Sequence, residues 1–181
     1  MVSPTRISHV VLQTNRIPEL RDWYCAMLGA SVVYEDSNIS FISFDDEHHR
    51  VAFINPGPVA LREGAGGDPL CAGKDTGLHH FAFTFARLAD LVESYERNKS
   101  RGVLPYWCVN HGPTTSMYYR DPDGNRVELL IDNFPTLAEC KAFMEGPKFA
   151  SNPIGVEFNP DDLAARFRAG VPVSELIAMP K

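Results

Sequence analysis

The sequence lacks the features that most directly assign a chain to a class. Its four cysteines (Cys25, Cys71, Cys108 and Cys140) form no Cys-x-x-Cys pair, so we expect free, buried thiols rather than a zinc ribbon or a disulfide framework. No apolar run is long enough for a signal peptide or a membrane span. Acidic side chains outnumber basic ones, 23 to 17, which disfavours nucleic acid and anionic membranes as partners. We therefore expect a cytoplasmic protein that acts on a small molecule.

The chain contains one order of elements twice. Its 181 residues are 44% hydrophobic and 22% charged, an ordinary globular composition. Apolar spacing predicts strand, helix and three strands over residues 6–56, and the same order begins again over residues 77–132, after a linker rich in Gly and Pro. We therefore predict an α+β fold in which two βαβββ modules form one domain, residues 1–132, with a cupped mixed β-sheet. Helices are expected at 17–28 and 88–99, and strands at 6–13, 31–34, 39–44, 50–55, 78–85 and 103–108.

A hairpin around Asp121-Pro-Asp-Gly124 is the strongest local signal. Proline presets φ and glycine accepts a positive φ, so these four residues favour a tight turn. On the strands beside it stand Tyr118 and Glu128, and alternation places Glu128 on the less apolar face. Taken singly, Glu128 is compatible with a solvated charge and Tyr118 with an ordinary sheet aromatic.

Two histidines occupy equivalent places in the repeat. His9 and His80 each lie near the start of the first strand of a module. If the modules pack side by side, these two histidines can face each other. Alternation groups His80 with Ala82 and Thr84, whose small side chains would leave room for a cavity.

These residues together resemble the vicinal oxygen chelate superfamily and, within it, the type I extradiol catechol dioxygenases. The resemblance covers residues 6–132. Its most specific part is a histidine, an aliphatic-Tyr pair, an Asp-Pro-x-Gly turn and a glutamate, which His111, Met117-Tyr118, the hairpin turn and Glu128 match in spacing. Many members carry a second, metal-free pair of modules, for which this chain is too short, so it would be a single-domain form.

The resemblance implies that His9, His80 and Glu128 bind a metal ion inside the cupped sheet. Two imidazoles and one carboxylate on one face of an octahedron suit Fe(II), with Mn(II) as the alternative, and leave three adjacent positions open. A ring-cleaving dioxygenase needs these positions for the two catechol oxygens and for O2. The implied reaction opens a catechol similar to 2,3-dihydroxybiphenyl and yields a muconic semialdehyde-type product.

Three further residues receive roles from the same resemblance. His49, in the segment His48-His49-Arg-Val-Ala-Phe, would donate and accept protons beside the O2 position. Tyr118 and His111 would hydrogen-bond the substrate oxygen. The competing interpretation of His48 and His49 is a pair of exposed loop histidines.

Other members of the superfamily offer alternative functions. Glyoxalase-type enzymes take a fourth ligand from the last strand of the first module, but Arg50–Asn55 contains no Asp, Glu or His. Thiol transferases of the fosfomycin-resistance type also use three ligands, so they stay open. A metal-free module that binds an aromatic drug is the third alternative. It is disfavoured because such a module should lack a complete set of metal ligands, whereas this sequence has His9, His80 and Glu128.

Two features remain undecided at this level. Residues 133–181 form a C-terminal extension with helical spacing at 135–144 and 161–170, and it could serve as a lid or as a subunit interface in a homo-oligomer. A substrate pocket could draw on Trp107, Phe44, Phe53 and Tyr119.

Overall fold

The computed structural model describes residues 2–60 and 77–179 and divides the chain into two compact units. The first unit consists of residues 1–65 with 121–125, and the second of residues 66–120 with 126–181. Most of the predicted linker, including Cys71, lies outside the described residues.

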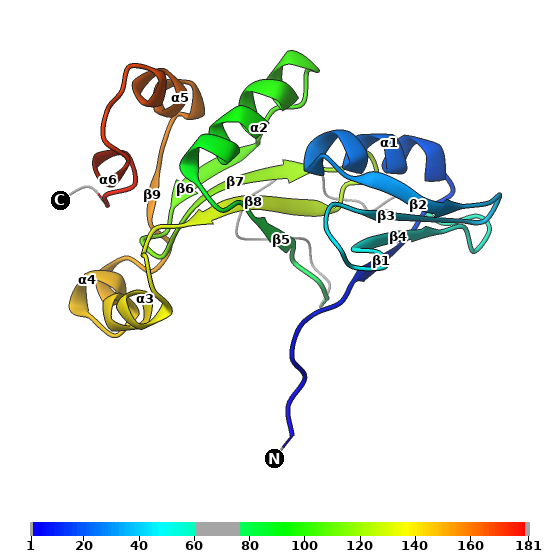
Figure 1. The fold of residues 1–181 in the computed structure, drawn as a ribbon, viewed down its shortest axis with the longest axis horizontal. Coiled ribbons are helices and arrows are strands. Elements are labelled where there is room, and N and C mark those ends of the chain that lie inside the picture. The colour runs from blue at the N-terminus through cyan, green and yellow to red at the C-terminus, as the bar shows by residue number, and fades with distance from the viewer. Residues whose placement is uncertain (1, 61–76, 180–181) are drawn as a thin grey trace. The chain divides into compact units, whose positions relative to one another are not determined.

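The first unit is one four-stranded sheet with a helix, α1, packed against it (Figure 1). The strand order is β1-β4-β3-β2, and only the β1–β4 pair is parallel. The apolar stripe of α1 buries Leu20, Tyr24 and Met27 completely, and the helix ends at Gly29, whose φ of 67° favours glycine. The bounds are β1 Val10–Gln13, α1 Ile17–Leu28, β2 Ser31–Glu35, β3 Ile39–Ser43 and β4 Val51–Ile54.

The second unit repeats this path and adds a strand from the extension. Its sheet has the order β5-β8-β7-β6-β9, with only β5–β8 parallel, and α2 packs against β8. Figure 1 shows β9 at the far edge of this sheet, between the pair α3 and α4 and the pair α5 and α6. The bounds are β5 Phe81–Thr84, α2 Leu88–Ser100, β6 Trp107–Asn110, β7 Thr114–Arg120, β8 Arg126–Asp132, α3 Leu137–Met144, α4 Pro147–Ser151, β9 Val156–Glu157, α5 Pro160–Arg168 and α6 Val173–Leu176. The α+β fold of two βαβββ modules is thereby confirmed.

The predicted hairpin turn forms as the sequence indicated. Asp121 accepts the backbone N–H groups of Asp123 (3.0 Å) and Asn125 (2.7 Å), and Gly124 takes a φ of 86°. The Asp121 carboxylate is buried and also accepts the Tyr24 hydroxyl of α1 at 2.9 Å. The turn is therefore fastened to α1 within the first unit.

Several boundaries and one burial prediction were wrong. His9 and His80 stand one residue before β1 and β5, because pairing begins at Val10 and Phe81. β6 begins at Trp107 rather than Val103, since Pro105 cannot donate to a ladder. Of the three described cysteines, only Cys108 is buried, whereas Cys25 and Cys140 are half-exposed. Among the described residues, no helix is long and apolar enough to cross a membrane.

Candidate active site

Glu128 is a buried carboxylate on the face of the second sheet opposite α2. Its side chain is 7% exposed, and its Oε2 lies 2.9 Å from Nε2 of His80. Burial alone would raise the pKa of Glu128, but hydrogen bonds with His80, Ser116 and Tyr118 outweigh burial and hold the pKa below its ordinary value. The interpretation of Glu128 as a solvated strand charge is therefore excluded, and the carboxylate is ionised at neutral pH.

Tyr118 stands directly across the ladder from Glu128 and also contacts His111. Its hydroxyl lies 3.0 Å from Nε2 of His111, whose Nδ1 lies 2.5 Å from the carbonyl oxygen of Ile154. Because that carbonyl can only accept, a neutral His111 keeps its proton on Nδ1 and offers Nε2 as an acceptor. Burial, followed by the charge of Glu128, raises the pKa of Tyr118 well above its ordinary value. The Tyr118 hydroxyl is thus a protonated donor with two acceptors within reach.

The C-terminal extension supports this face of the sheet. Ile154 precedes β9, so the extension supplies the carbonyl that orients His111. On β9 itself, Glu157 accepts the indole N–H of Trp107 at 2.7 Å. Trp107 in turn packs on Tyr118, with ring centroids 4.8 Å apart. The sequence did not predict these contacts, since they depend on where a two-residue strand pairs.

Of the four predicted pocket aromatics, only Trp107 lies on this face. Tyr119 alternates with Tyr118 and is completely buried on the opposite face, which α2 covers. Phe53 is completely buried against Tyr24 of α1, and Phe44 is 42% exposed. Ser116, which the sequence reasoning missed, is two residues before Tyr118 and shares its face, so strand alternation could have found it.

In the first unit, His49 lies between two rings. Its imidazole stacks on Phe41 with centroids 4.4 Å apart and on His9 with centroids 4.3 Å apart. Burial, and then the neighbouring imidazoles His9 and His48, lower the pKa of His49. A neutral His49 at pH 7 can accept a proton. The description as exposed loop histidines fits His48 but not His49.

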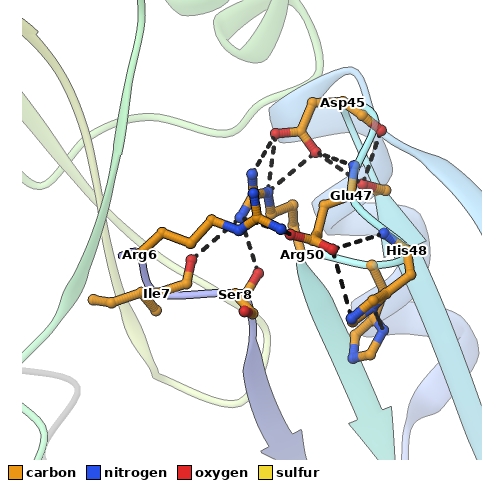
Figure 2. Close-up of polar contacts among 9 residues, drawn as sticks. Arg6, Ile7, Ser8, Asp45, Glu47, His48 and Arg50 are labelled. Atoms are coloured by element: carbon orange, nitrogen blue, oxygen red, sulfur yellow. Dashed lines mark hydrogen bonds and ion pairs between the residues drawn. The ribbon is translucent and has the colours of Figure 1, made fainter. Parts of the chain in front are cut away.

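Arg50 ties the segment before His9 to the loop that carries His49 (Figure 2). Its guanidinium donates to the carboxylate of Asp45 (Nη2–Oδ2 2.8 Å) and to the carbonyl oxygens of Ile7 (3.2 Å) and Ser8 (3.0 Å). Its own carbonyl accepts the N–H of Val10 at 3.0 Å. Arg50 therefore holds the backbone on both sides of His9.

The predicted site residues thus fall into two groups. The second unit brings together His80, Glu128, Tyr118 and His111, and the first unit brings together His9 and His49. The assignment of His9, His80 and Glu128 as one ligand set, and of His49, His111 and Tyr118 as catalytic residues, stays a prediction.

Comparison with known proteins assigns the family. Residues 6–129 match the model of the glyoxalase/bleomycin resistance protein/dioxygenase superfamily. The chain belongs to this superfamily. It is 48% identical to biphenyl-2,3-diol 1,2-dioxygenase 2 of Rhodococcus globerulus over 97% of its own length and 88% of the relative's. It is 47% identical to biphenyl-2,3-diol 1,2-dioxygenase 3 of the same organism over 97% of its length and 89% of the relative's.

Solved structures agree with the fold. A glyoxylase/bleomycin resistance protein/dioxygenase domain from Frankia sp. EAN1pec matches 74% of the chain and 96% of its own length, with a TM-score of 0.56 and 18% identity. At that identity the likeness concerns the fold alone. The two Rhodococcus relatives, in contrast, extend over the C-terminal extension as well as the superfamily modules.

Proposed function

We propose that the chain is an extradiol dioxygenase that cleaves biphenyl-2,3-diol or a closely similar catechol. The observation that carries this proposal is the 48% identity to a biphenyl-2,3-diol 1,2-dioxygenase over nearly the whole of both chains. The reaction adds both atoms of O2 to the substrate, one C–C bond of the ring breaks, and the product carries an aldehyde or ketone and a carboxylate. No external reductant is consumed.

The residues present fit a divalent metal ion, which the family relationship implies. Glu128 is a buried, ionised carboxylate whose Oε2 lies 2.9 Å from an imidazole nitrogen of His80, and carboxylate with imidazole is a donor set that Fe(II) accepts. His9, His80 and Glu128 would hold the ion, with Fe(II) proposed and Mn(II) as the alternative. When bound, the metal supplies chelation of the two catechol oxygens and one-electron chemistry between substrate and O2.

The chain's own residues would move the protons. Tyr118, whose hydroxyl stays protonated, can turn its single proton from Nε2 of His111 to a deprotonated catechol oxygen. His49, neutral at pH 7, can take up the proton that the catechol releases and return it when the ring opens. The aromatic face of Trp107 beside Tyr118 offers a flat surface to an aromatic ring.

The test is anaerobic purification, metal analysis, and a screen of catechols for O2 uptake and a yellow product. We expect one divalent ion per chain and the highest kcat/KM for biphenyl-2,3-diol. Glu128→Ala removes the only anionic ligand, so it should lose the ion and the activity. Enzyme that carries the ion but opens no catechol, while adding a thiol to an epoxide, would show that the proposal is wrong. A homo-oligomer stays a prediction, which sedimentation of the same preparation checks.

A further inference from the structure

Beside the proposed catalytic residues, the first unit contains a third imidazole that the reaction does not use. We define the tri-histidine cluster as His9, His48 and His49; one ring nitrogen from each lies within 4.8 Å of the others. His48 is the extra member, with a side chain 62% exposed. The ring centroids of His48 and His49 are 4.5 Å apart, and those of His48 and His9 are 5.9 Å apart.

Two nitrogen atoms of this cluster face each other. Nδ1 of His48 and Nδ1 of His49 are 2.7 Å apart. Nε2 of His48 faces Oε1 of Glu47 at 3.5 Å, and a carboxylate favours the tautomer with its proton on that nitrogen. The lone pair of His48 is then on Nδ1, directed at His49. An imidazole whose second nitrogen faces a carboxylate is the usual support of a metal-bound histidine.

Glu47 is itself held in place for this role. Figure 2 shows Arg6 and Arg50 reaching toward Glu47 from the side away from His48. Arg6 Nη2 lies 2.7 Å from Oε2 and Arg50 Nη1 lies 3.9 Å from the same oxygen. Oε1 is left to His48, whose backbone N–H also donates to it at 3.2 Å.

We propose that the tri-histidine cluster binds a divalent ion such as Zn²⁺. This site shares His9 with the proposed catalytic ligand set, so only one of the two sites can be occupied at a time. Three neutral imidazoles and a water molecule form a tetrahedral set that Zn²⁺ accepts. Zn–N distances near 2.0–2.1 Å place ligand nitrogens roughly 3.3 Å apart. Nitrogens of the cluster that lie up to 4.8 Å apart must therefore approach by about 1.5 Å at most, whereas the Nδ1 atoms of His48 and His49, 2.7 Å apart, must separate by roughly 0.6 Å. His9 and His48 are exposed, which leaves their rings free to turn.

The consequence of occupation is inhibition, and this part rests on the proposed function. An ion in the cluster withdraws His9 from the proposed catalytic ligand set and His49 from proton transfer. His48 does neither in the proposed reaction, so its removal separates the two sites.

The second His-His pair of the chain provides a matched control. Nδ1 of His79 and Nδ1 of His80 are also 2.7 Å apart. Here, however, the outer nitrogen of His79 accepts from the guanidinium of Arg126 at 2.9 Å, so a cation stands where Glu47 stands beside His48. His79→Ala should therefore leave zinc binding at the cluster unchanged.

The binding experiment needs no turnover. Metal-free full-length Glu128→Ala, which lacks the catalytic carboxylate, is titrated with Zn²⁺ by calorimetry, alone and combined with His48→Ala or His79→Ala. We expect one ion per chain in Glu128→Ala and in the His79 combination, and an affinity at least about 100-fold lower with His48→Ala, since even outer-shell changes cost about 10–100-fold. Equal affinity in all three would overturn the proposal.

A second measurement covers the case in which Glu128→Ala does not fold. In the unsubstituted metal-free chain, histidine ring signals are followed by NMR during the zinc titration. Movement of the His48 signals with those of His9 and His49 supports the site. Movement of His80 without His48 would place the ion at the catalytic ligands alone and contradict the proposal.

The inhibition experiment then uses the metal-loaded enzyme. His48→Ala should keep the wild-type rate of catechol cleavage and need at least about tenfold more Zn²⁺ for half inhibition. Equal sensitivity of wild type and His48→Ala would overturn the inhibitory role. A chain without any dioxygenase activity would contradict the proposed function but leave the binding result intact.

Discussion

His49 is a side chain positioned by stacking, and its role can be separated from metal binding. We predict that His49→Gln retains the metal and binds catechol anaerobically as wild type does, because His49 is not one of the proposed ligands and glutamine replaces it with a polar side chain that does not titrate. The turnover rate should fall by about 10²–10⁴-fold, which is the usual rate contribution of a general acid–base group. Stopped-flow measurements under limiting O2, with anaerobic binding measured in parallel, test this. Wild-type turnover would show that His49 transfers no proton in the slow step.

Tyr118 and Tyr119 form an adjacent pair for a matched comparison. Tyr118→Phe removes the hydroxyl between His111 and Glu128, so we expect kcat to fall by about 10–100-fold, while the ion is retained. Tyr119 faces the other side of the sheet, where its hydroxyl contacts Met117 Sδ at 3.8 Å, away from His111 and Glu128. Tyr119→Phe should therefore keep the wild-type rate. Equal losses in the two variants would mean that the hydroxyls act through stability, which urea unfolding would reveal.

At the scale of elements, Arg50 connects the start of β1 to the loop before β4. Arg50→Met leaves the carbonyls of Ile7 and Ser8 without this donor, and we expect a lower free energy of unfolding together with weaker metal retention. Arg87→Met breaks an exposed ion pair with Asp90 and should change the free energy of unfolding less than Arg50→Met does. Urea unfolding and metal analysis of both variants provide the test. Full metal retention in Arg50→Met would show that the hydrogen bonds of Arg50 to Ile7 and Ser8 do not position His9.

The contact between α2 and α5 carries a pH dependence. Asp161, which follows the cap residue Asn159, accepts the Tyr95 hydroxyl at 2.7 Å and pairs with Lys99. Lys99 and then Tyr95 lower the pKa of Asp161. A depressed carboxyl pKa stabilises the fold above the pKa of the unfolded chain, about 3.9, and this contribution is lost as the pH falls through the lower folded value.

Asp161→Asn should therefore be less stable than wild type at pH 7, and the difference should shrink as the pH falls below about 4. Thermal unfolding at a series of pH values measures it. If the difference in stability between wild type and Asp161→Asn stays constant down to pH 3, the substitution destabilises the N-terminus of α5 by a route other than loss of the carboxylate charge.

Elements with a strong local signal were predictable from the sequence, and those that depend on distant pairing were not. The bounds of α1 were predicted to the residue, because its apolar stripe and Gly29 are both local. The Asp121–Gly124 turn was likewise predictable. β9 has two residues, and its place beside β6 depends partly on Gly155, where a Cβ would lie 2.1 Å from the carbonyl oxygen of Asn110.

At the scale of the whole molecule, the sequence named the candidate site residues more completely than it named the groups that hold them in position. The resemblance named His80 and Glu128, 48 positions apart, as metal ligands, and the structure places Nε2 of His80 2.9 Å from Oε2 of Glu128. The partners that fix the site were not visible, because the Ile154 carbonyl that orients His111 is a backbone group with no sequence signature. The sequence did not single out His48 as a possible ligand, because residue spacing cannot show which histidine ring nitrogens lie close together.

Metal binding should also be measurable as stability of the whole chain. An ion that binds only the native state stabilises it by about 2.7 kcal/mol at 100 times its Kd and by about 1.4 kcal/mol more for each further tenfold rise. For a chain of this length, about 1 kcal/mol corresponds to a Tm change of roughly 2–4 °C. Removal of Fe(II) by a chelator under anaerobic conditions should therefore lower Tm by roughly 5–11 °C relative to the Tm measured with free Fe(II) at 100 times its Kd.

Glu128→Ala provides the control, because it lacks the anionic ligand and should show no Fe(II)-dependent shift over the same range. A scan at several free metal concentrations distinguishes binding from a general salt effect, since only binding gives a shift that grows with the logarithm of Fe(II). An equal shift in Glu128→Ala would contradict the ligand assignment. Wild-type Tm independent of Fe(II), in a preparation that still opens catechols, would mean that binding of the ion does not stabilise the native chain through the buried carboxylate 2.9 Å from His80.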